Sequence, residues 1–475
     1  MPTLKTLTQT AMLGAAPESA LLSSAAQAGI ATLGGLQLPY TESVAPCPAE
    51  TLPQMPESAA LLFKRILAGE FDALLPEFLQ LTAAHGMIVP PETLPALLGL
   101  GKKELRVLVL PVIGERGRWL AGFNPSWAYA VAEGDGDWET GSFEQRRMLI
   151  ERLRVTAPAK ARELVQSTWK QDAPEARSAF LAAFTVGLSR TDEDFLESCL
   201  ADRRKEIRDA ALDLLVALPD SKLIMRVSTK LNTFLQLKSK LLNKTSLIIN
   251  LPDGRDELTK EIGVNTTSLR KNLGEGANWL AFMLSLVPPS HWSSTWKLSP
   301  GKTIEAALNS EWGEAMLLGW SLALQRVSDP DWALAFAEIA VNKPKVRIMF
   351  AENSLSAIMR QVPAEKLEAL AQISITLKMN ELDDKHPLMA VLENYPHSWS
   401  VRLARTVMYS IRRQVGAYHW LLMHALPGFA LRIPPELADE FIEAWPQETR
   451  GWETHIQKFN ATLRFRCDMV EAFRA

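Results

Sequence analysis

One short run of the sequence invites a nucleotide-binding interpretation: Gly301, Lys302 and Thr303 follow one another as they do at the end of a phosphate-binding loop. Such a loop needs another glycine five residues before the first of these three, so that the backbone can curl round the phosphates, and it follows a strand. Trp296 stands at that position, and no strand is predicted before it. The sequence therefore predicts no nucleotide site, and no other motif indicates a cofactor.

Alternating acidic residues form a second candidate. Asp135, Asp137 and Glu139 have the spacing of ligands in a calcium-binding loop. Thr140, however, stands where the sharp turn of that loop needs glycine, and Arg146 stands where a bidentate glutamate is needed. An acidic surface loop is the better interpretation.

Two histidines, His419 and His424, lie five residues apart. Helical metal ligands that share a face lie four apart, and no carboxylate is placed to complete a site here. The sequence also contains no Gly-x-Ser-x-Gly elbow, no His-Glu-x-x-His motif and no cluster of cysteines. We therefore predict no catalytic residue, no metal ligand and no cofactor, and an enzyme with an unrecognised site is the least favoured class.

A run of basic residues is the strongest binding signal. Between Ser221 and Leu251 there are six basic residues and no acidic one. The first three lie four residues apart and share one helix face; the six, which we call the basic strip, are Lys222, Arg226, Lys230, Lys238, Lys240 and Lys244. Such a strip can bind phosphate groups or an acidic protein. The alternative is a solvated helix face with no partner.

The elements that position the candidate residues are predicted to be helices. The clearest patterns of apolar residues in the chain have helical spacing. Apolar residues at helical spacing predict helices over 143–155 and 158–170. The most regular helix has apolar residues at i, i+3, i+4, i+7, i+8 and i+11, namely Ile207, Ala210, Ala211, Leu214, Leu215 and Leu218. Because the loops between these helices are short, neighbouring helices should be antiparallel.

Capping patterns mark the two helices in between. Asp172 with Glu175 is a capping-box pattern before a helix that ends near residue 188, and Thr191 with Asp194 opens the next. The run Asp202–Leu214 then resembles the second helix of a HEAT repeat. Asp202 and Arg208 within it suggest a catalytic pair, but a structural role, satisfying backbone groups between repeats, is the better interpretation.

The whole pattern predicts an all-α fold: a HEAT-like α-α superhelix, or solenoid, with an irregular insert and a second helical block. Residues 105–113 fit either a strand or a buried helix, and residues 245–251 fit one short strand. The predicted regions are an N-terminal helical region with a Pro-rich linker at 1–140, helical repeats at 141–235, an irregular segment at 236–275 and a C-terminal helical block at 276–475.

Composition bounds the function. The chain has 475 residues, 47% of them apolar, and its 51 basic and 54 acidic residues give a net charge of −3, which argues against a protein wholly devoted to nucleic acid. The cysteines Cys47, Cys199 and Cys467 are far apart and odd in number, so no disulfide framework is predicted, and Cys199 fits a buried thiol. With no secretory signal or apolar span, we expect a cytoplasmic protein and no membrane contact.

The 14 tryptophans are many for this length. Most lie beside or inside apolar helical patterns, where packing in the core is the expected role. A stacking surface for bases or peptides is the alternative.

Three stretches carry a resemblance to a known family: PPETLPALLGLG at 90–101, GERGRWLAGFNPSWAYA at 114–130 and TDEDFLESCLADRRKEIRDAALDLLVALPDS at 191–221. Looser similarity covers 274–292 and 463–473. In these motifs the chain resembles an uncharacterised family of bacterial HEAT-like helical-repeat proteins, a domain of unknown function. Members are often encoded beside a MoxR-type AAA+ ATPase, a von Willebrand A-domain protein and a SWIM zinc-finger protein.

The resemblance implies a protein partner and supplies no catalytic residue. Our leading hypothesis is a non-enzymatic interaction scaffold or adaptor that works with the MoxR-type ATPase and the von Willebrand A-domain protein. The alternative is a nucleic-acid-binding or repair protein of the HEAT-like class. No small-molecule substrate is identified.

Overall fold

The computed structural model describes residues 10, 12–13, 18–33, 45–100, 103–131, 138–239, 245–253, 255–262, 264, 268–377, 386 and 388–474. The chain divides into two compact units, residues 1–49 and 50–475. In the first unit, helix α2 (Glu18–Leu33) is uncharged apart from its first residue.

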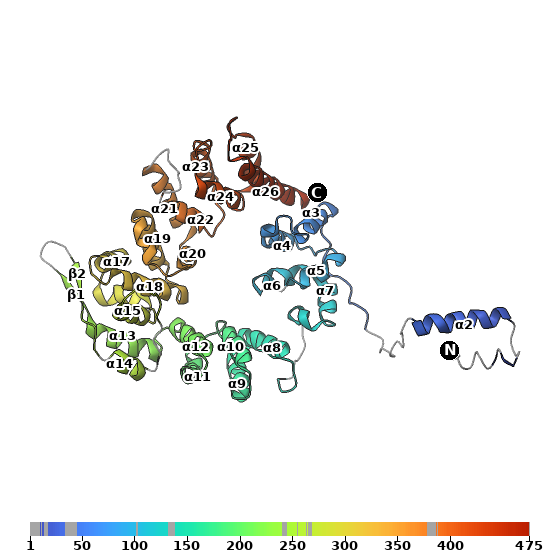
Figure 1. Ribbon diagram of the computed structural model, residues 1–475, viewed down its shortest axis with the longest axis horizontal. Helices are drawn as coiled ribbons and strands as arrows, with labels where there is room; N and C mark the ends of the chain where they lie inside the picture. Colours follow the sequence, from blue (N-terminus) through green and yellow to red (C-terminus); the bar gives the residue numbers. More distant parts are fainter. Residues whose placement is uncertain are drawn as a thin grey trace. The chain divides into compact units, whose positions relative to one another are not determined.

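Of the residues that the structure describes, 68% are helical and 2% lie in strands, which confirms the all-α prediction (Figure 1). The second unit begins with short helices, several of which have a proline among their first two residues, where its fixed φ suits the first helical turn. These are α3 (Glu57–Leu67), η1 (Asp72–Leu74), α4 (Leu75–Ala84), η2 (Pro91–Thr93), α5 (Leu94–Leu98), α6 (Lys103–Val109), η3 (Leu110–Val112), α7 (Gly114–Ala121) and η4 (Pro125–Ala130). Residues 105–113, for which the sequence left strand and helix open, are therefore helical.

The central helices follow the predicted order: α8 (Phe143–Thr156), α9 (Pro158–Thr168), α10 (Pro174–Ala183), η5 (Arg190–Asp192), α11 (Glu193–Cys199), α12 (Lys205–Ala217) and α13 (Lys222–Phe234). Consecutive helices pack in pairs, α8 on α9 and α11 on α12, while α10 contacts both α8 and α12. The apolar face predicted for α12 is buried, with Ile207, Ala211 and Leu215 fully shielded from solvent.

Both predicted caps are wrong. Asp172 does not cap α10, whose N-cap is Ala173 with no side-chain bond; its carboxylate instead accepts a hydrogen bond from Arg146 at 2.7 Å. Before α11 the capping box joins Ser189 and Asp192, two residues earlier than predicted. In the first case the predicted cap pairs with an arginine, and in the second Asp192, which pairs with Arg154, belongs to the capping box.

The segment after α13 contains a small antiparallel hairpin, β1 (Leu235–Ser239) with β2 (Thr245–Ile249), in which Leu237 pairs with Leu247. The predicted short strand is therefore present, and its partner was missed. Among the described residues this two-stranded sheet is the only one.

The rest of the unit is helical: α14 (Arg255–Ile262), α15 (Glu275–Leu284), α16 (Pro289–Trp296), α17 (Pro300–Leu308), α18 (Gly313–Arg326), α19 (Pro330–Asn342), η6 (Pro344–Met349), α20 (Ser354–Met359), α21 (Ala364–Leu377), α22 (Met389–Glu393), α23 (Val401–Arg412), α24 (Trp420–Phe429), η7 (Pro435–Leu437), α25 (Ala438–Glu443) and α26 (Glu453–Ala472). Gly319 of α18 lies so close to α15 that an added Cβ would sit 2.6 Å from the carbonyl oxygen of Ala281. This small residue therefore lets the two helices approach closely.

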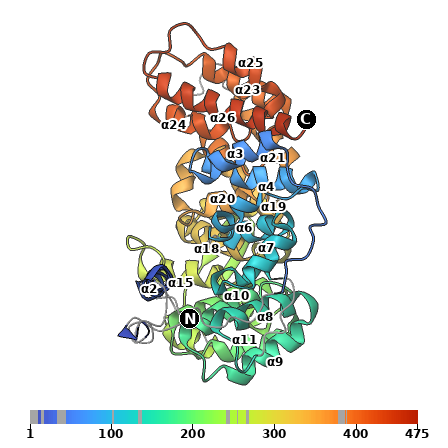
Figure 2. The ribbon, with the colours of Figure 1, turned by 90° about the vertical axis from the view of Figure 1, so that its right-hand side faces the viewer.

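The last helix of the unit packs against the first ones. Phe465 of α26 stacks on Phe71, with ring centroids 4.4 Å apart, and Phe473 lies 5.5 Å from Phe78 of α4. Figures 1 and 2 both place α26 beside α3, at opposite ends of the colour scale. Residues 55–130 and the end of α26 consequently share one hydrophobic core, while a second core runs from Trp138 to Leu463.

A buried arginine fastens this contact. Arg466 of α26 is 3% exposed and donates two hydrogen bonds to Glu77 of α4, both at 2.7 Å. It also donates to the carbonyl oxygens of Ala430, at 2.6 Å, and Ile433. We call Arg466 and Glu77 the closing pair.

No helix in the described part of the chain is long and apolar enough to cross a membrane.

Candidate functional site

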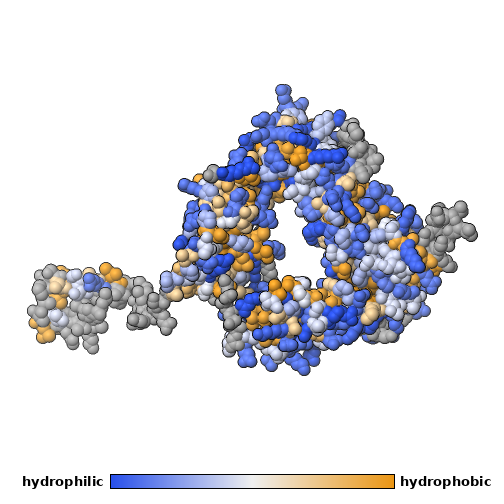
Figure 3. All heavy atoms as spheres, turned by 180° about the vertical axis from the view of Figure 1, so that it is seen from behind, coloured by the Kyte–Doolittle hydropathy of each residue, from blue (hydrophilic) through white to orange (hydrophobic). Residues whose placement is uncertain are grey.

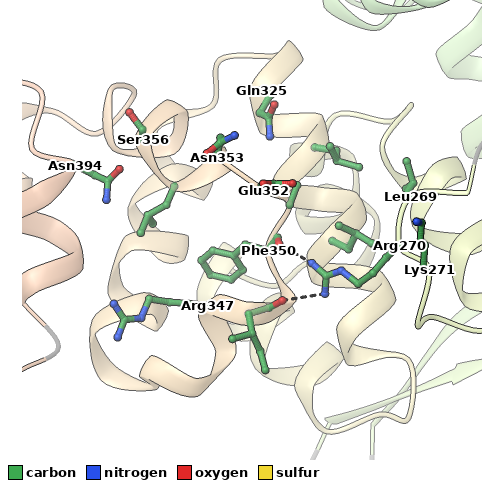
Figure 4. Close-up of a pocket in the computed structure, with 15 residues that line it drawn as sticks. Leu269, Arg270, Lys271, Gln325, Arg347, Phe350, Glu352, Asn353, Ser356 and Asn394 are labelled. Atoms are coloured by element: carbon green, nitrogen blue, oxygen red, sulfur yellow. Dashed lines mark hydrogen bonds between the residues drawn. The ribbon is translucent and has the colours of Figure 1, made fainter. Parts of the chain in front are cut away.

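The structure contains a recess of about 800 Å³ on the second helical block (Figure 4). Its walls come from the loop before α15, from α18, from η6 and the loop that follows it, and from α20, with Asn394 after α22. Figure 4 places Arg347 and Asn394 at one end and Arg270 and Lys271 at the other, with Glu352 and Asn353 between them. The recess is therefore elongated, with basic residues at both ends.

The loop at one end is fixed by Asn278, which is 7% exposed at the base of α15. Its Oδ1 atom accepts hydrogen bonds from the backbone N–H groups of Leu269 and Arg270, both at 2.9 Å. Its Nδ2 group donates to the carbonyl oxygens of Arg270, at 2.9 Å, and Leu273, at 2.6 Å. The side-chain amide of Asn278 thus hydrogen-bonds to four backbone groups of the loop and fixes the conformation of the loop.

Arg270 ties this loop to the segment that follows η6. Its Nη1 group donates to Glu314 at 2.7 Å and to the carbonyl oxygen of Ile348 at 2.9 Å, and its Nη2 group donates to the carbonyl oxygen of Phe350 at 2.7 Å. Figure 4 shows the two backbone bonds as dashed lines. Because its charge is paired with Glu314, Arg270 positions the recess and offers little to a ligand.

The opposite wall is held by a buried serine. Ser321 of α18 is fully buried, accepts a hydrogen bond from the N–H group of Ala351 at 2.8 Å and donates to the carbonyl oxygen of Leu318 at 2.9 Å. Two residues after Ala351, the backbone of Asn353 adopts the left-handed conformation, with φ 58°. Asparagine tolerates that conformation better than most residues, and the turn leaves its side chain exposed on the rim.

Two cations of the recess keep hydrogen-bonding capacity for a ligand. Arg347 is half-buried, and its Nε group donates to the carbonyl oxygen of Pro344 at 3.1 Å. Burial lowers the pKa of Arg347, and the nearby carboxylate of Glu393 opposes that shift. Within the described residues, no hydrogen bond engages its terminal amino groups, and Lys271 makes no ion pair.

Three side-chain amides complete the lining. Asn394 donates from Nδ2 to the carbonyl oxygen of Ala390 at 2.9 Å, which leaves its Oδ1 atom as an acceptor. Gln325 and Asn353 are exposed and make no hydrogen bond through their amides to any residue the structure describes. Each amide has both a donor and an acceptor, so together they can bind the N–H and C=O groups of a peptide backbone.

The basic strip differs from its prediction in one respect. Lys222, Arg226 and Lys230 lie on one helix, α13, as predicted, but their neighbourhood is not free of acids. Lys222 pairs with Asp194 at 2.7 Å and Arg226 with Glu197 at 3.0 Å, both acids coming from α11.

The ion pair of Lys222 with Asp194 changes the pKa values of both groups. The hydrogen bond from Lys222 lowers the pKa of Asp194, and the same bond raises the pKa of Lys222. Lys238 lies in β1, while Lys240 and Lys244 fall outside the described residues. As a partner site the strip stays a prediction, but the premise of uncompensated charge is wrong for Lys222 and Arg226.

Asp202 and Arg208 have a structural role, but Arg208 bonds backbone groups of the loop before its own helix and not those of a neighbouring repeat. Arg208 donates to the carbonyl oxygens of Asp202, at 2.8 Å, and Arg203, at 3.0 Å. The carboxylate of Asp202 pairs with Arg177 of α10 and accepts the N–H group of Arg204 at 2.9 Å. The loop between α11 and α12 is thereby fixed to α10.

The weak motifs are explained by structure as well. Lys302 lies inside α17 and pairs with Glu305 at 2.8 Å, and Thr303 is buried there. Asp135 and Asp137 lie outside the described residues. In the described part of the chain, no three His, Cys, Asp or Glu side chains group together as metal ligands.

Of the candidate histidines, His424 bonds through Nδ1 to the carbonyl oxygen of Trp420 at 2.7 Å and lies 4.8 Å from the ring of His455. His419 precedes α24 as its N-cap and makes no side-chain cap bond. The two predicted neighbours therefore have different environments.

Most tryptophans are core residues, as expected. The largest fully buried side chains include Trp292, Trp320, Trp332 and Trp452. Trp420 is the exception, since it is 53% exposed on the surface of α24.

Sequence reasoning did not find the recess, because its lining comes from positions between 269 and 394 that share no local motif. The signals that existed were individually weak: an asparagine after an acidic residue at 352–353, and an arginine after a proline-opened turn at 344–347.

Comparison with known proteins adds one finding. A protein-family model described as a family of unknown function matches residues 1–473. No curated protein and no solved structure matches the chain.

Proposed function

Since this chain belongs to DUF5691, a family of unknown function, its activity must be inferred from its own structure, and we propose that it is a non-enzymatic scaffold or adaptor that binds other proteins. The observation that carries the proposal is the recess. Its amides, its two cations with unused donors and its leucine side chains suit the backbone, acidic groups and apolar groups of a protein segment.

Exposed aromatic side chains support the same function. Tyr409 is 64% exposed, Tyr418 79% and Trp420 53%, all within the last third of the chain. Tyrosine and tryptophan are enriched at the energetic centres of protein interfaces, because they bury much area at little entropic cost. Figure 3 also shows apolar residues on parts of the rim around an opening in the unit of residues 50–475.

A finer architecture belongs to the proposal. The paired packing of α8 with α9 and of α11 with α12 is the contact pattern of stacked helical hairpins. We propose that these hairpins form a HEAT-like solenoid, in which each pair buries its apolar face on the next.

The identity of the partners rests on the resemblance of the motifs at 90–101, 114–130 and 191–221. It implies a MoxR-type AAA+ ATPase and a von Willebrand A-domain protein, and we propose these two as the proteins that the scaffold joins. A cytoplasmic location would place all three in one compartment.

Co-purification tests the proposal. The tagged full-length chain is expressed in its native host, cells are crosslinked, and the recovered proteins are identified by mass spectrometry. We expect the ATPase and the von Willebrand protein in the eluate and absent from a tag-only control. Failure to recover either protein after crosslinking would overturn the proposed partnership.

The alternative, nucleic-acid binding, stays a prediction with less support. Two of the six residues on which it rested are paired with Asp194 and Glu197, so their field at the surface is reduced. A titration with labelled single-stranded and double-stranded DNA at two salt concentrations decides it, because phosphate binding weakens steeply with salt.

A further inference from the structure

We propose that the recess binds an extended peptide segment whose acidic side chains pair with Lys271 at one end and Arg347 at the other. The proposal rests on the scaffold function and names the chemistry of the segment that the scaffold holds. It follows from three properties of the recess: its shape, its hydrogen-bonding groups and its charge.

Shape favours an elongated occupant. Residues of α18, η6, α20 and the loops beside them line the volume of about 800 Å³, and Figure 4 places Lys271 and Arg347 on opposite sides of it. An extended chain advances about 3.3 Å per residue and needs a trough of this kind. A compact ligand would leave one of the two basic ends unused.

The hydrogen-bonding groups suit a peptide backbone. An extended segment outside a sheet carries unpaired N–H and C=O groups, which must be satisfied when water is removed. Gln325, Asn353 and Asn394 provide side-chain amides along the recess, two of them with no bond to a described residue and the third with a free acceptor. Amides bind a backbone of any sequence, so they supply affinity without selecting side chains.

The charges select the acidic side chains. Glu314 pairs with Arg270, and Glu393 lies near Arg347, but no described residue bonds the terminal amino groups of Arg347 or forms an ion pair with Lys271. Arg347 is half-buried, so its guanidinium has lost part of its hydration. The carboxylate of a bound peptide can accept the hydrogen bonds that water would otherwise accept. A peptide carboxylate at each end therefore meets a complementary charge.

Glu352 opposes an acidic group in the middle of the recess, where Figure 4 places it between the two ends. The arrangement therefore predicts acidic residues at the two ends of the bound segment and a neutral or apolar residue between them. Leu322 and Leu355 line the same recess and provide the apolar contact for that central residue.

The test uses the full-length protein and a displayed library of random twelve-residue peptides. Peptides selected on the wild-type protein are synthesised with a fluorescent label, and their dissociation constants are measured by anisotropy at low and high salt. We expect the selected peptides to carry acidic residues and to bind more weakly as salt increases.

Three variants make the test specific. The double variant Lys271→Gln with Arg347→Gln should weaken binding at least about tenfold, and Glu352→Gln should strengthen it, because one variant removes attraction and the other repulsion. Lys302→Gln is the matched control, since Lys302 is an exposed lysine outside the recess and should leave binding unchanged. Should the double variant fold poorly, the opposite effect expected of Glu352→Gln still decides the question.

The proposal is overturned if no peptide is enriched, if the enriched peptides are basic, or if they bind wild type and the double variant equally. These outcomes differ from failure of the scaffold function. Recovery of the ATPase and the von Willebrand protein by both the wild type and the double variant would refute the recess as the contact while leaving the scaffold intact.

Discussion

Replacing Arg466 with methionine should open the contact between α26 and the first helices of the unit. The change removes a guanidinium that is 3% exposed and that donates to Glu77, Ala430 and Ile433. Methionine fills much of the space of the arginine stem, so the loss is mainly that of the charged donors and not of packing.

The magnitude follows from the groups left behind. Breaking a buried ion pair by removing one partner costs about 3–5 kcal/mol when the other charge stays buried. The side chain of Glu77 is 35% exposed, so water can hydrate its carboxylate and reduce that cost. The two carbonyl groups lose their donor in the interior, at about 1–3 kcal/mol each when unsatisfied. We expect a loss of about 3 kcal/mol, and a smaller loss for Glu77→Gln, which keeps one acceptor for the arginine.

Hydrogen–deuterium exchange is the suitable assay, because it reports the opening of each segment separately. A loss of about 3 kcal/mol should speed exchange in α3, α4 and α26 by about a hundredfold. Exchange in α17 to α19 should not change. The matched control is Arg405→Met, which breaks an exposed pair with Glu440 at 2.9 Å and should have no comparable effect.

A cycle with Glu77→Gln separates the pair from the rest of the site. If the double variant exchanges no faster than Arg466→Met alone, the two side chains act as one unit, as the structure indicates. Exchange in α3 and α4 that stays at the wild-type rate in Arg466→Met would refute our view that the closing pair holds these helices together.

Three further outcomes are expected. Leu214→Asp places an unpaired carboxylate at a position 5% exposed and should lower the melting temperature of the helical signal sharply, as followed by circular dichroism; an unchanged melt would remove Leu214 from the core. Reversing Lys222 and Arg226 to glutamate should lower the melting temperature modestly, because each glutamate would face an acid of α11, and exchanging those acids for lysines should restore it; equal melting of all forms would show that the pairs contribute nothing. Burial raises the pKa of Cys199 to about 12, so iodoacetamide at pH 8 should modify it in denaturant and not in the native protein, as peptide mass spectrometry would show; rapid native labelling would contradict its burial.

The helical class could be predicted because it depends on spacing along one chain segment. The predicted helix at 143–155 is observed as Phe143–Thr156, and the buried face of α12 is the predicted one. The predicted helix caps were wrong because other groups compete for a capping side chain. Asp172 has the right position for a cap, but its carboxylate pairs with Arg146, which lies 26 residues earlier in the chain. No local rule contains that competitor.

The same reason limited the candidate sites. The basic strip was identified by counting acids between 221 and 251, whereas the acids that pair with it lie at 194 and 197 on α11, two helices before α13. The recess left no sequence pattern, since it depends on the packing of α18 against α20 and on the amide of Asn278. Contacts of this kind are set by tertiary structure and cannot be read from spacing.

The closing pair also has a consequence for synthesis of the protein. Glu77 and Arg466 are 389 residues apart, so a ribosome has made nearly the whole described chain before the second partner exists. Until then the apolar side chains of Phe78 and Leu79 lack the cover of Phe473 and Met469 and resemble a chaperone-binding surface. Bringing such distant ends of a flexible chain together would cost about 5 kcal/mol of loop entropy, whereas helices already folded between them hold the ends near each other. A nascent chain truncated before α26 would therefore keep an exposed apolar face, and proteases could distinguish it from the finished protein.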